Sequence, residues 1–156
     1  SKVNKKGDKK MKIALGCDHG GVEHKNAILE HLKDRGFEVK DFGIYEVKSV
    51  DYPDIAEKVC FEVTSGNAQL GILVCGTGIG MSLAANKVKG IRAAACSEHF
   101  SAKFTRLHNN SNVLCLGGRV VGAGLACELV DVFLNTEFEG GRHQRRIDQI
   151  MEIENS

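Results

Sequence analysis

Short apolar runs alternate along the chain with longer stretches in which apolar residues recur at helical spacing. The runs are rich in branched side chains, which is typical of strands buried in a parallel sheet. They predict strands over residues 12–16, 37–42, 71–74, 90–95 and 112–116. The periodic stretches predict helices over residues 22–36, 55–64, 81–85, 98–107, 122–134 and 142–153.

This alternation predicts an α/β protein: a three-layer α/β/α sandwich with a five-stranded parallel sheet, Rossmann-like in architecture. Segment 37–42 alternates apolar and polar residues, so we expect it near an edge of the sheet. Asp54 is expected to cap helix 55–64, and Ser97 the helix that runs to Leu107. With 156 residues, the chain is long enough for one domain with a substantial core, but not for two.

Charge is unevenly distributed along the chain. Residues 1–10 hold five lysines and one aspartate, a net charge of +4, and the whole chain carries +1, so the remainder carries −3. This mildly acidic body argues against nucleic acid as a partner. We expect residues 1–10 to be a disordered basic leader or an expression remnant, and residues 11–156 to form a single domain. No apolar window of about 18 residues occurs, so no membrane partner is expected.

The six cysteines stand singly, without a C-x-x-C pair. They are Cys17, Cys60, Cys75, Cys96, Cys115 and Cys127. This spacing indicates reduced thiols in a cytoplasmic protein and does not favour a zinc site. We therefore expect no metal.

The central stretch, GILVCGTGIGMSLAAN at residues 71–86, combines a buried strand, a glycine-rich turn and a helix start. Glycines at alternate positions let the backbone approach a ligand and adopt positive φ, and the helix start presents free N–H groups to that ligand. Cys75 lies at the mouth of this loop, where the positive end of the helix favours a thiolate. The stretch therefore predicts an anion site beside a reactive thiol.

Three familiar motifs do not fit this loop. A cysteine phosphatase would need an arginine where Met81 stands, a Walker loop would end in Gly-Lys-Ser/Thr, and the dinucleotide fingerprint has a different glycine spacing. The alternative that stays open is structural: Cys75 is a buried residue at the end of a strand, and the glycines form only a tight turn.

Polar residues follow several predicted strands at the point where each strand ends. Ligands of parallel α/β sheets bind at these carboxyl ends. The residues concerned are Asp18, His19, Cys75, Thr77, the segment 97–99 and Arg119. Taken singly, Asp18 could be a helix cap, His19 a turn residue and Arg119 a surface charge. As a set they indicate a binding site.

A second basic feature begins the last predicted helix. Arg142 and Arg146 lie four residues apart and share a helix face, so together they can hold a phosphate or a carboxylate, whereas Arg145 points elsewhere. The alternative is a solvated basic face. The two glycines at 140–141 favour the anion cradle.

Five segments carry a resemblance to a known family. They are GCDHGG (16–21), VDYPD (50–54), GILVCGTGIGMSLAANKVKGIRAA (71–94), HNNSNVLCLGGRVVG (108–122) and FEGGRHQRRI (138–147). Together they resemble the type B ribose-5-phosphate isomerases, of the family that also contains allose-6-phosphate and galactose-6-phosphate isomerases. The resemblance runs from about Met11 to the C-terminus.

The resemblance implies an aldose–ketose isomerase that needs no metal or cofactor and acts through an enediolate. Cys75 would be the base, with the Thr77 hydroxyl and the helix end lowering its pKa toward working pH. Backbone around Gly76, Gly78, Ile79 and Gly80 would hold the oxyanion. Some relatives use a glutamate as base, but this chain has the cysteine-type motif.

The family pattern also implies how the sugar ring opens and where the substrate lies. His108, followed by Asn109, would open the ring, with Asp18 handling hydroxyl protons. His99 is the competing candidate for this role. Tyr52 would line the sugar pocket.

The phosphate would face four basic residues, and the site would be shared between subunits. These residues are His19, Arg119, Arg142 and Arg146. Similar proteins are homodimers or dimers of dimers, so His108 and Arg119 could serve the neighbour's site. Ribose 5-phosphate is the expected substrate. The alternatives are a six-carbon sugar phosphate, or a non-catalytic phosphosugar-binding or nucleotide-binding module.

Overall fold

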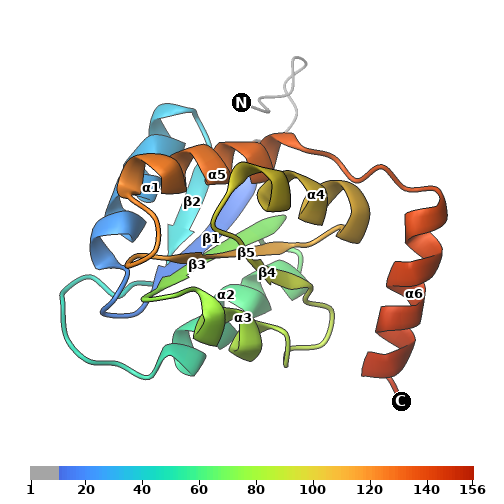
Figure 1. Ribbon diagram of the computed structural model, residues 1–156. Helices are drawn as coiled ribbons and strands as arrows, with labels where there is room; N and C mark the ends of the chain where they lie inside the picture. The colour runs from blue at the N-terminus through green and yellow to red at the C-terminus, as the bar shows by residue number, and fades with distance from the viewer. Residues whose placement is uncertain (1–10) are drawn as a thin grey trace.

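A computed structural model describes residues 11–156 and shows a parallel sheet between two layers of helices (Figure 1). The expectation for residues 1–10 lies outside the described residues. The strands are β1 (Lys12–Cys17), β2 (Glu38–Asp41), β3 (Leu70–Cys75), β4 (Ala93–Ala95) and β5 (Val113–Gly117). The helices are α1 (Val22–Asp34), α2 (Tyr52–Thr64), α3 (Ile79–Ala85), α4 (His99–Asn109), α5 (Ala123–Asn135) and α6 (Arg142–Glu154).

The sheet has the strand order β2-β1-β3-β5-β4, and all its pairings are parallel. Helices α2 and α3 pack on one face, and α1, α4 and α5 cover the other (Figure 1). The three central strands are buried almost throughout because helices cover both of their faces. This arrangement confirms the predicted three-layer α/β/α sandwich, with β2 at an edge as expected.

The other edge strand, β4, is shorter than predicted. Gly90 has φ +89° and the Ile91 N–H bonds back to the Val88 carbonyl, so the chain is still turning where the strand was expected to begin. The Asn86 side chain donates to the Ala93 carbonyl at 2.9 Å and accepts from the Ala93 N–H at 2.8 Å. The Asn86 side-chain amide therefore pairs with the N–H and C=O groups of Ala93 that face away from β5.

Two predicted helix caps were wrong. Helix α2 begins at Tyr52 after Asp51, because a proline in the first turn fits a helix start, and Asp54 lies inside that turn. Helix α4 is capped by Glu98 instead of Ser97, since its carboxylate accepts a hydrogen bond from the Ser101 N–H at 2.9 Å.

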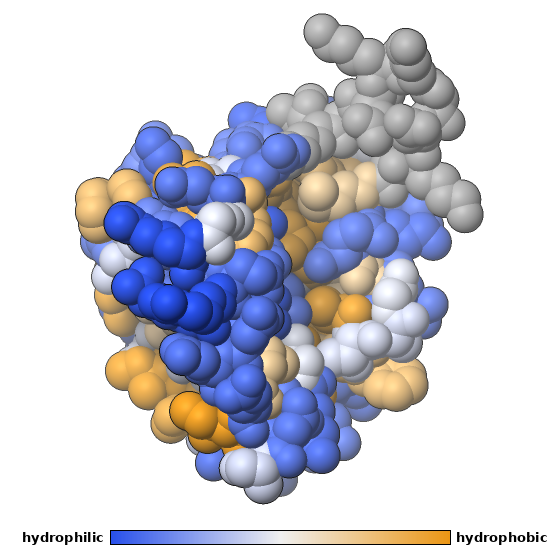
Figure 2. All heavy atoms as spheres, turned by 90° about the vertical axis from the view of Figure 1, so that its right-hand side faces the viewer, coloured by the Kyte–Doolittle hydropathy of each residue, from blue (hydrophilic) through white to orange (hydrophobic). Residues whose placement is uncertain are grey.

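Helix α6 stands apart from the body of the domain and contacts mainly α4 (Figure 1). Only His143 and Ile147 of this helix are buried, whereas Ile153 is 75% exposed. Figure 2 shows the face on which α6 lies, with hydrophilic groups over much of it and apolar groups between and below them. Within residues 11–156, no helix combines the length and the apolar character that a membrane crossing needs.

Candidate active site

Cys75 ends strand β3 at the carboxyl edge of the sheet. Cys75 is 5% exposed, and its sulfur accepts a hydrogen bond from the Gly78 N–H at 3.1 Å. Gly78 has φ +80°, and a β-carbon there would lie 3.0 Å from the Leu116 carbonyl carbon, so the turn requires glycine. A backbone N–H directed at a sulfur stabilises a negative charge on it. The loop therefore presents a thiol in a setting suited to a base.

Thr77 is exposed on the same loop. Its hydroxyl oxygen accepts a hydrogen bond from the Ile79 N–H at 3.2 Å and so stabilises the turn that enters α3. The expected action of this hydroxyl on the Cys75 thiol stays a prediction. Ile79, also exposed, begins α3, and Gly80 follows it.

The turn after β1 packs directly against the Cys75 loop. Buried Asp18 accepts a hydrogen bond from the Gly20 N–H at 2.8 Å, and its own N–H donates to the Val74 carbonyl at 3.1 Å. A β-carbon on Gly20 would lie only 2.9 Å from the Gly76 nitrogen. Asp18 is thereby held beside the loop, with His19 exposed next to it.

Two larger side chains border this loop from other elements. The Arg119 side chain lies over Gly76, since a β-carbon there would be 3.7 Å from Arg119 Cδ, and the Arg119 N–H donates to the Gly76 carbonyl at 3.0 Å. The Tyr52 ring lies against Gly80, where a β-carbon would come within 2.9 Å of Tyr52 Cζ. The thiol, a carboxylate, a guanidinium and a phenol thus lie around one loop at the carboxyl ends of the strands, where ligands of parallel sheets bind.

His108 and Asn109 lie beside the amino ends of the strands, whereas Cys75 of the same chain lies at their carboxyl ends. They end α4, and the chain then enters the first residue of β5, Val113, whereas Cys75 pairs with Gly117 at the far end of that strand. The five residues of β5 span about 15 Å between the amino and carboxyl ends of the strand. His99 begins α4, toward the Cys75 edge. Within one chain, the predicted base Cys75 therefore lies far from the predicted ring-opening residue His108.

His108 has an aromatic and acidic environment of its own. Its ring stacks on His143 with centroids 4.1 Å apart, and Phe104 contacts it edge-on at 4.9 Å. His108 Nε2 lies 3.6 Å from a Glu139 carboxylate oxygen. Burial, and next the neighbouring His108, lowers the pKa of His143, which favours its neutral imidazole. The sequence reasoning missed Glu139 and His143, although both lie in the quoted segment 138–147.

These three residues could also be considered as metal ligands. His108, Glu139 and His143 offer ligand atoms that lie within 4.8 Å of one another. The two imidazole planes differ by only 12°, so their nitrogen lone pairs do not converge on one ion. Arg142 and Arg146 also add positive charge near His143. The arrangement suits proton transfer and anion binding better than metal binding.

The other five thiols are held in their neutral form. Burial raises their pKa, to about 11 for Cys17 and Cys96 and to about 12 for Cys60, with Cys115 and Cys127 shifted in the same direction. Iodoacetamide should therefore modify Cys75 first, because alkylation requires a thiolate, burial disfavours the thiolates of the other five, and the Gly78 N–H is directed at the Cys75 sulfur. Peptide mass mapping over time would show the Cys75 adduct forming first, and a bound sugar phosphate should slow its formation. Faster labelling of half-buried Cys127 would contradict the prediction.

Comparison with known proteins places the chain in a family. Residues 13–150 match the family described as Ribose/Galactose Isomerase. The chain belongs to this family. Ribose-5-phosphate isomerase B of Escherichia coli is 51% identical over 143 residues, which cover 92% of this chain and 96% of that protein. The resemblance carried by the five sequence segments is thus confirmed.

Two solved structures of family members match the fold closely. The ribose-5-phosphate isomerase B of Clostridium thermocellum shares 53% identity with a TM-score of 0.92, covering 93% of this chain and 98% of that one. The enzyme of Mycoplasma genitalium with bound ribulose-5-phosphate shares 44% identity with a TM-score of 0.90, covering 96% and 99%. The chain is therefore an isomerase with the fold of this family.

Proposed function

We propose that this protein interconverts D-ribose 5-phosphate and D-ribulose 5-phosphate through an enediolate, without a metal or cofactor. The observation that carries the proposal is the Cys75 thiol at the carboxyl edge, held by the Gly78 N–H and bordered by Asp18 and Arg119. The names of the most similar relatives support this substrate.

In the proposed reaction Cys75 acts as a general base on the open-chain sugar. The thiolate takes the proton from C2 of the aldose, and the electron pair forms the enediolate double bond as the carbonyl oxygen at C1 becomes an oxyanion. Loop N–H groups between Gly76 and Gly80 hold that oxyanion, other than those of Gly78 and Ile79, which bond to Cys75 and Thr77. The proton of the C2 hydroxyl then passes to the oxygen at C1, with Asp18 handling this transfer. As the C2 carbonyl forms, the thiol returns its proton to C1, which gives the ketose and restores the thiolate.

The second half of the proposal is that two copies of the chain build each site. Cys75 and His108 lie at opposite edges of one sheet, so a copy that presents its α4 end to its neighbour's loop would complete the set. In that arrangement His108 and Asn109 open the ring, while Arg142 and Arg146 join His19 and Arg119 at the phosphate. The detached α6, with exposed Ile150 and Ile153, suits such an exchange. We infer a cytoplasmic homodimer or dimer of dimers.

Conversion of ribose 5-phosphate to ribulose 5-phosphate by the purified protein, in excess chelator, tests this function. We expect turnover that resists the chelator and exceeds that of allose 6-phosphate. A protein that converts only the hexose would keep the mechanism but change the substrate, since one hydroxymethylene group is discriminated by few contacts. Binding of both sugars without turnover of either would overturn the enzymatic proposal in favour of a phosphosugar-binding module.

A further inference from the structure

The main chain at the end of α4 accepts hydrogen bonds from donors outside the helix. His108 and Asn109 end the helix, and Asn110 follows in the left-handed conformation, with φ +45°. The last carbonyl groups of a helix have no partner within it and need donors from elsewhere. Which residue supplies these donors therefore decides how firmly His108 and Asn109 are oriented.

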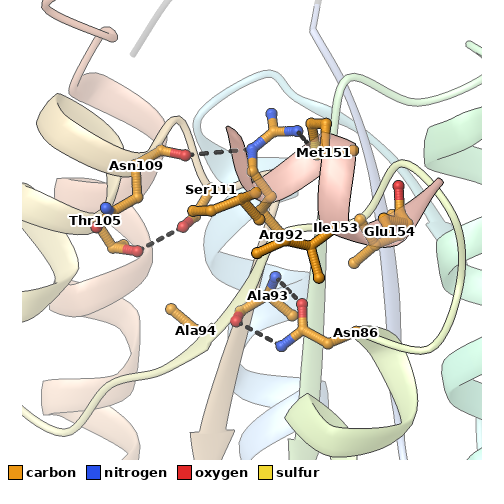
Figure 3. Close-up of a pocket in the computed structure, with 12 residues that line it drawn as sticks. Asn86, Arg92, Ala93, Ala94, Thr105, Asn109, Ser111, Met151, Ile153 and Glu154 are labelled. Atoms are coloured by element: carbon orange, nitrogen blue, oxygen red, sulfur yellow. Dashed lines mark hydrogen bonds between the residues drawn. The ribbon is translucent and has the colours of Figure 1, made fainter. Parts of the chain in front are cut away.

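Arg92, just before β4, supplies them for the last two carbonyls, those of Asn109 and Asn110, while the Glu139 N–H donates to the Leu107 carbonyl at 3.0 Å. Arg92 Nε donates to the Asn109 carbonyl at 3.2 Å and to the Asn110 carbonyl at 3.1 Å, and its Nη2 donates to the Asn110 carbonyl at 2.8 Å. A positive charge at this position also complements the negative end of the α4 dipole. Figure 3 shows the guanidinium extending between the end of α4 and α6.

The same side chain reaches α6. Arg92 Nη1 lies 3.7 Å from the Met151 sulfur, and nearby Glu154 accepts two hydrogen bonds from the Gly90 N–H, at 3.1 and 3.2 Å. These contacts tie the second half of α6 to the segment that carries Arg92. At the other end of α6, the first turn contacts α4 through the stacking of His143 on His108.

Arg92 is also fixed on its own backbone. Its N–H donates to the Asn112 side chain at 2.8 Å, and its carbonyl accepts from the Asn112 N–H at 2.9 Å. Burial lowers the pKa of its guanidinium, which nevertheless remains charged. The charged guanidinium therefore places two donors, Nε and Nη2, on two adjacent carbonyls, which fixes their direction more strictly than a packing contact would.

We propose that Arg92 is a positioning residue for ring opening: it fixes His108 and Asn109 at the end of α4 and holds them in register with the phosphate-binding start of α6. The inference rests on the proposed function of His108. Arg92 itself contacts no reacting atom in this assignment. It acts through the main chain of Asn109 and Asn110.

Arg92→Lys tests the proposal because lysine keeps the charge but loses the planar fork that reaches both carbonyls. Misplacing a catalytic group by about 1 Å costs roughly 10²-fold in rate, so we expect turnover of ribose 5-phosphate to fall by about tenfold to a hundredfold. Ribulose 5-phosphate is already open, because its C5 oxygen carries the phosphate. Exchange of its C1 proton with D₂O, followed by NMR, should change less than about twofold.

Arg35→Lys is the matched control. Arg35 lies on the surface after α1, where it pairs with Asp131, and its replacement should leave both rates unchanged. Equal losses of isomerisation and exchange in Arg92→Lys, or no loss in either, would overturn the proposal. Urea unfolding of Arg92→Lys and Arg92→Met identifies any variant that has simply lost its fold.

A readout that needs no activity separates this inference from the proposed function. The His108 ring protons lie in the ring currents of His143 and Phe104, so a displaced α4 end should shift their NMR signals. Unshifted His108 signals in folded Arg92→Lys would refute the positioning role whatever the enzyme does. An inactive wild-type protein would instead refute the isomerase assignment.

Discussion

Cys75→Ala should reduce isomerisation of ribose 5-phosphate by roughly 10²- to 10⁴-fold, the usual contribution of a general base. The sulfur accepts the Gly78 N–H at 3.1 Å, and no other group in the proposed mechanism removes the C2 proton. Binding of the sugar phosphate should change little, because the phosphate contacts are elsewhere. Initial rates give kcat, and titration calorimetry gives Kd.

The exchange reaction sharpens this prediction. Cys75→Ala should abolish C1 proton exchange in ribulose 5-phosphate as well as isomerisation, since both need the same base. Cys127→Ala, which removes a thiol from α5, is the control and should retain both activities. Near-normal turnover by Cys75→Ala would take the base role away from Cys75.

His108→Asn should affect the two reactions unequally, whereas Cys75→Ala should abolish both. We expect isomerisation of ribose 5-phosphate to fall by about 10²-fold or more, because the ring must be opened by an acid–base group. Exchange at C1 of the acyclic ketose should remain close to the wild-type rate. Both rates can be measured by NMR on the same samples. An equal fall in both would move the ring-opening role to His99 or indicate damage to α4.

Mixing the two inactive variants tests whether the site is shared. If His108 of one copy serves Cys75 of another, a mixed dimer of Cys75→Ala and His108→Asn contains one site with both residues intact and one site with neither. Unfolding and refolding the variants together should therefore restore activity that neither has alone. Mixtures that stay as inactive as their components would show that each chain relies on its own residues.

Local patterns predicted the sheet because its central strands are apolar on both faces. The boundaries that failed depended on side chains distant in sequence or on competing caps: β4 begins only at Ala93, where Asn86 takes up its main-chain groups, and Glu98 outcompetes Ser97 as the α4 cap. Neither outcome is visible in hydrophobic spacing. Both depend on which hydrogen bond the folded backbone can satisfy.

For the site, the carboxyl-edge rule correctly brought Asp18, Cys75 and Arg119 together, because it follows from parallel strand direction alone. The separation of His108 from Cys75 follows from the same geometry, since a helix that returns between parallel strands must end at the amino edge. The stacking of His143 on His108 could not be predicted in this way. It depends on where α6 comes to rest after a long connection.

The amide of Asn86 has a consequence for solubility. A sheet edge with free N–H and C=O groups is a template on which another chain can add a strand. Here that edge is only three residues long, and both outer groups of Ala93 are already bonded to one side chain. The Asn86 amide therefore leaves fewer free main-chain groups on the β4 edge with which a strand of another molecule could pair.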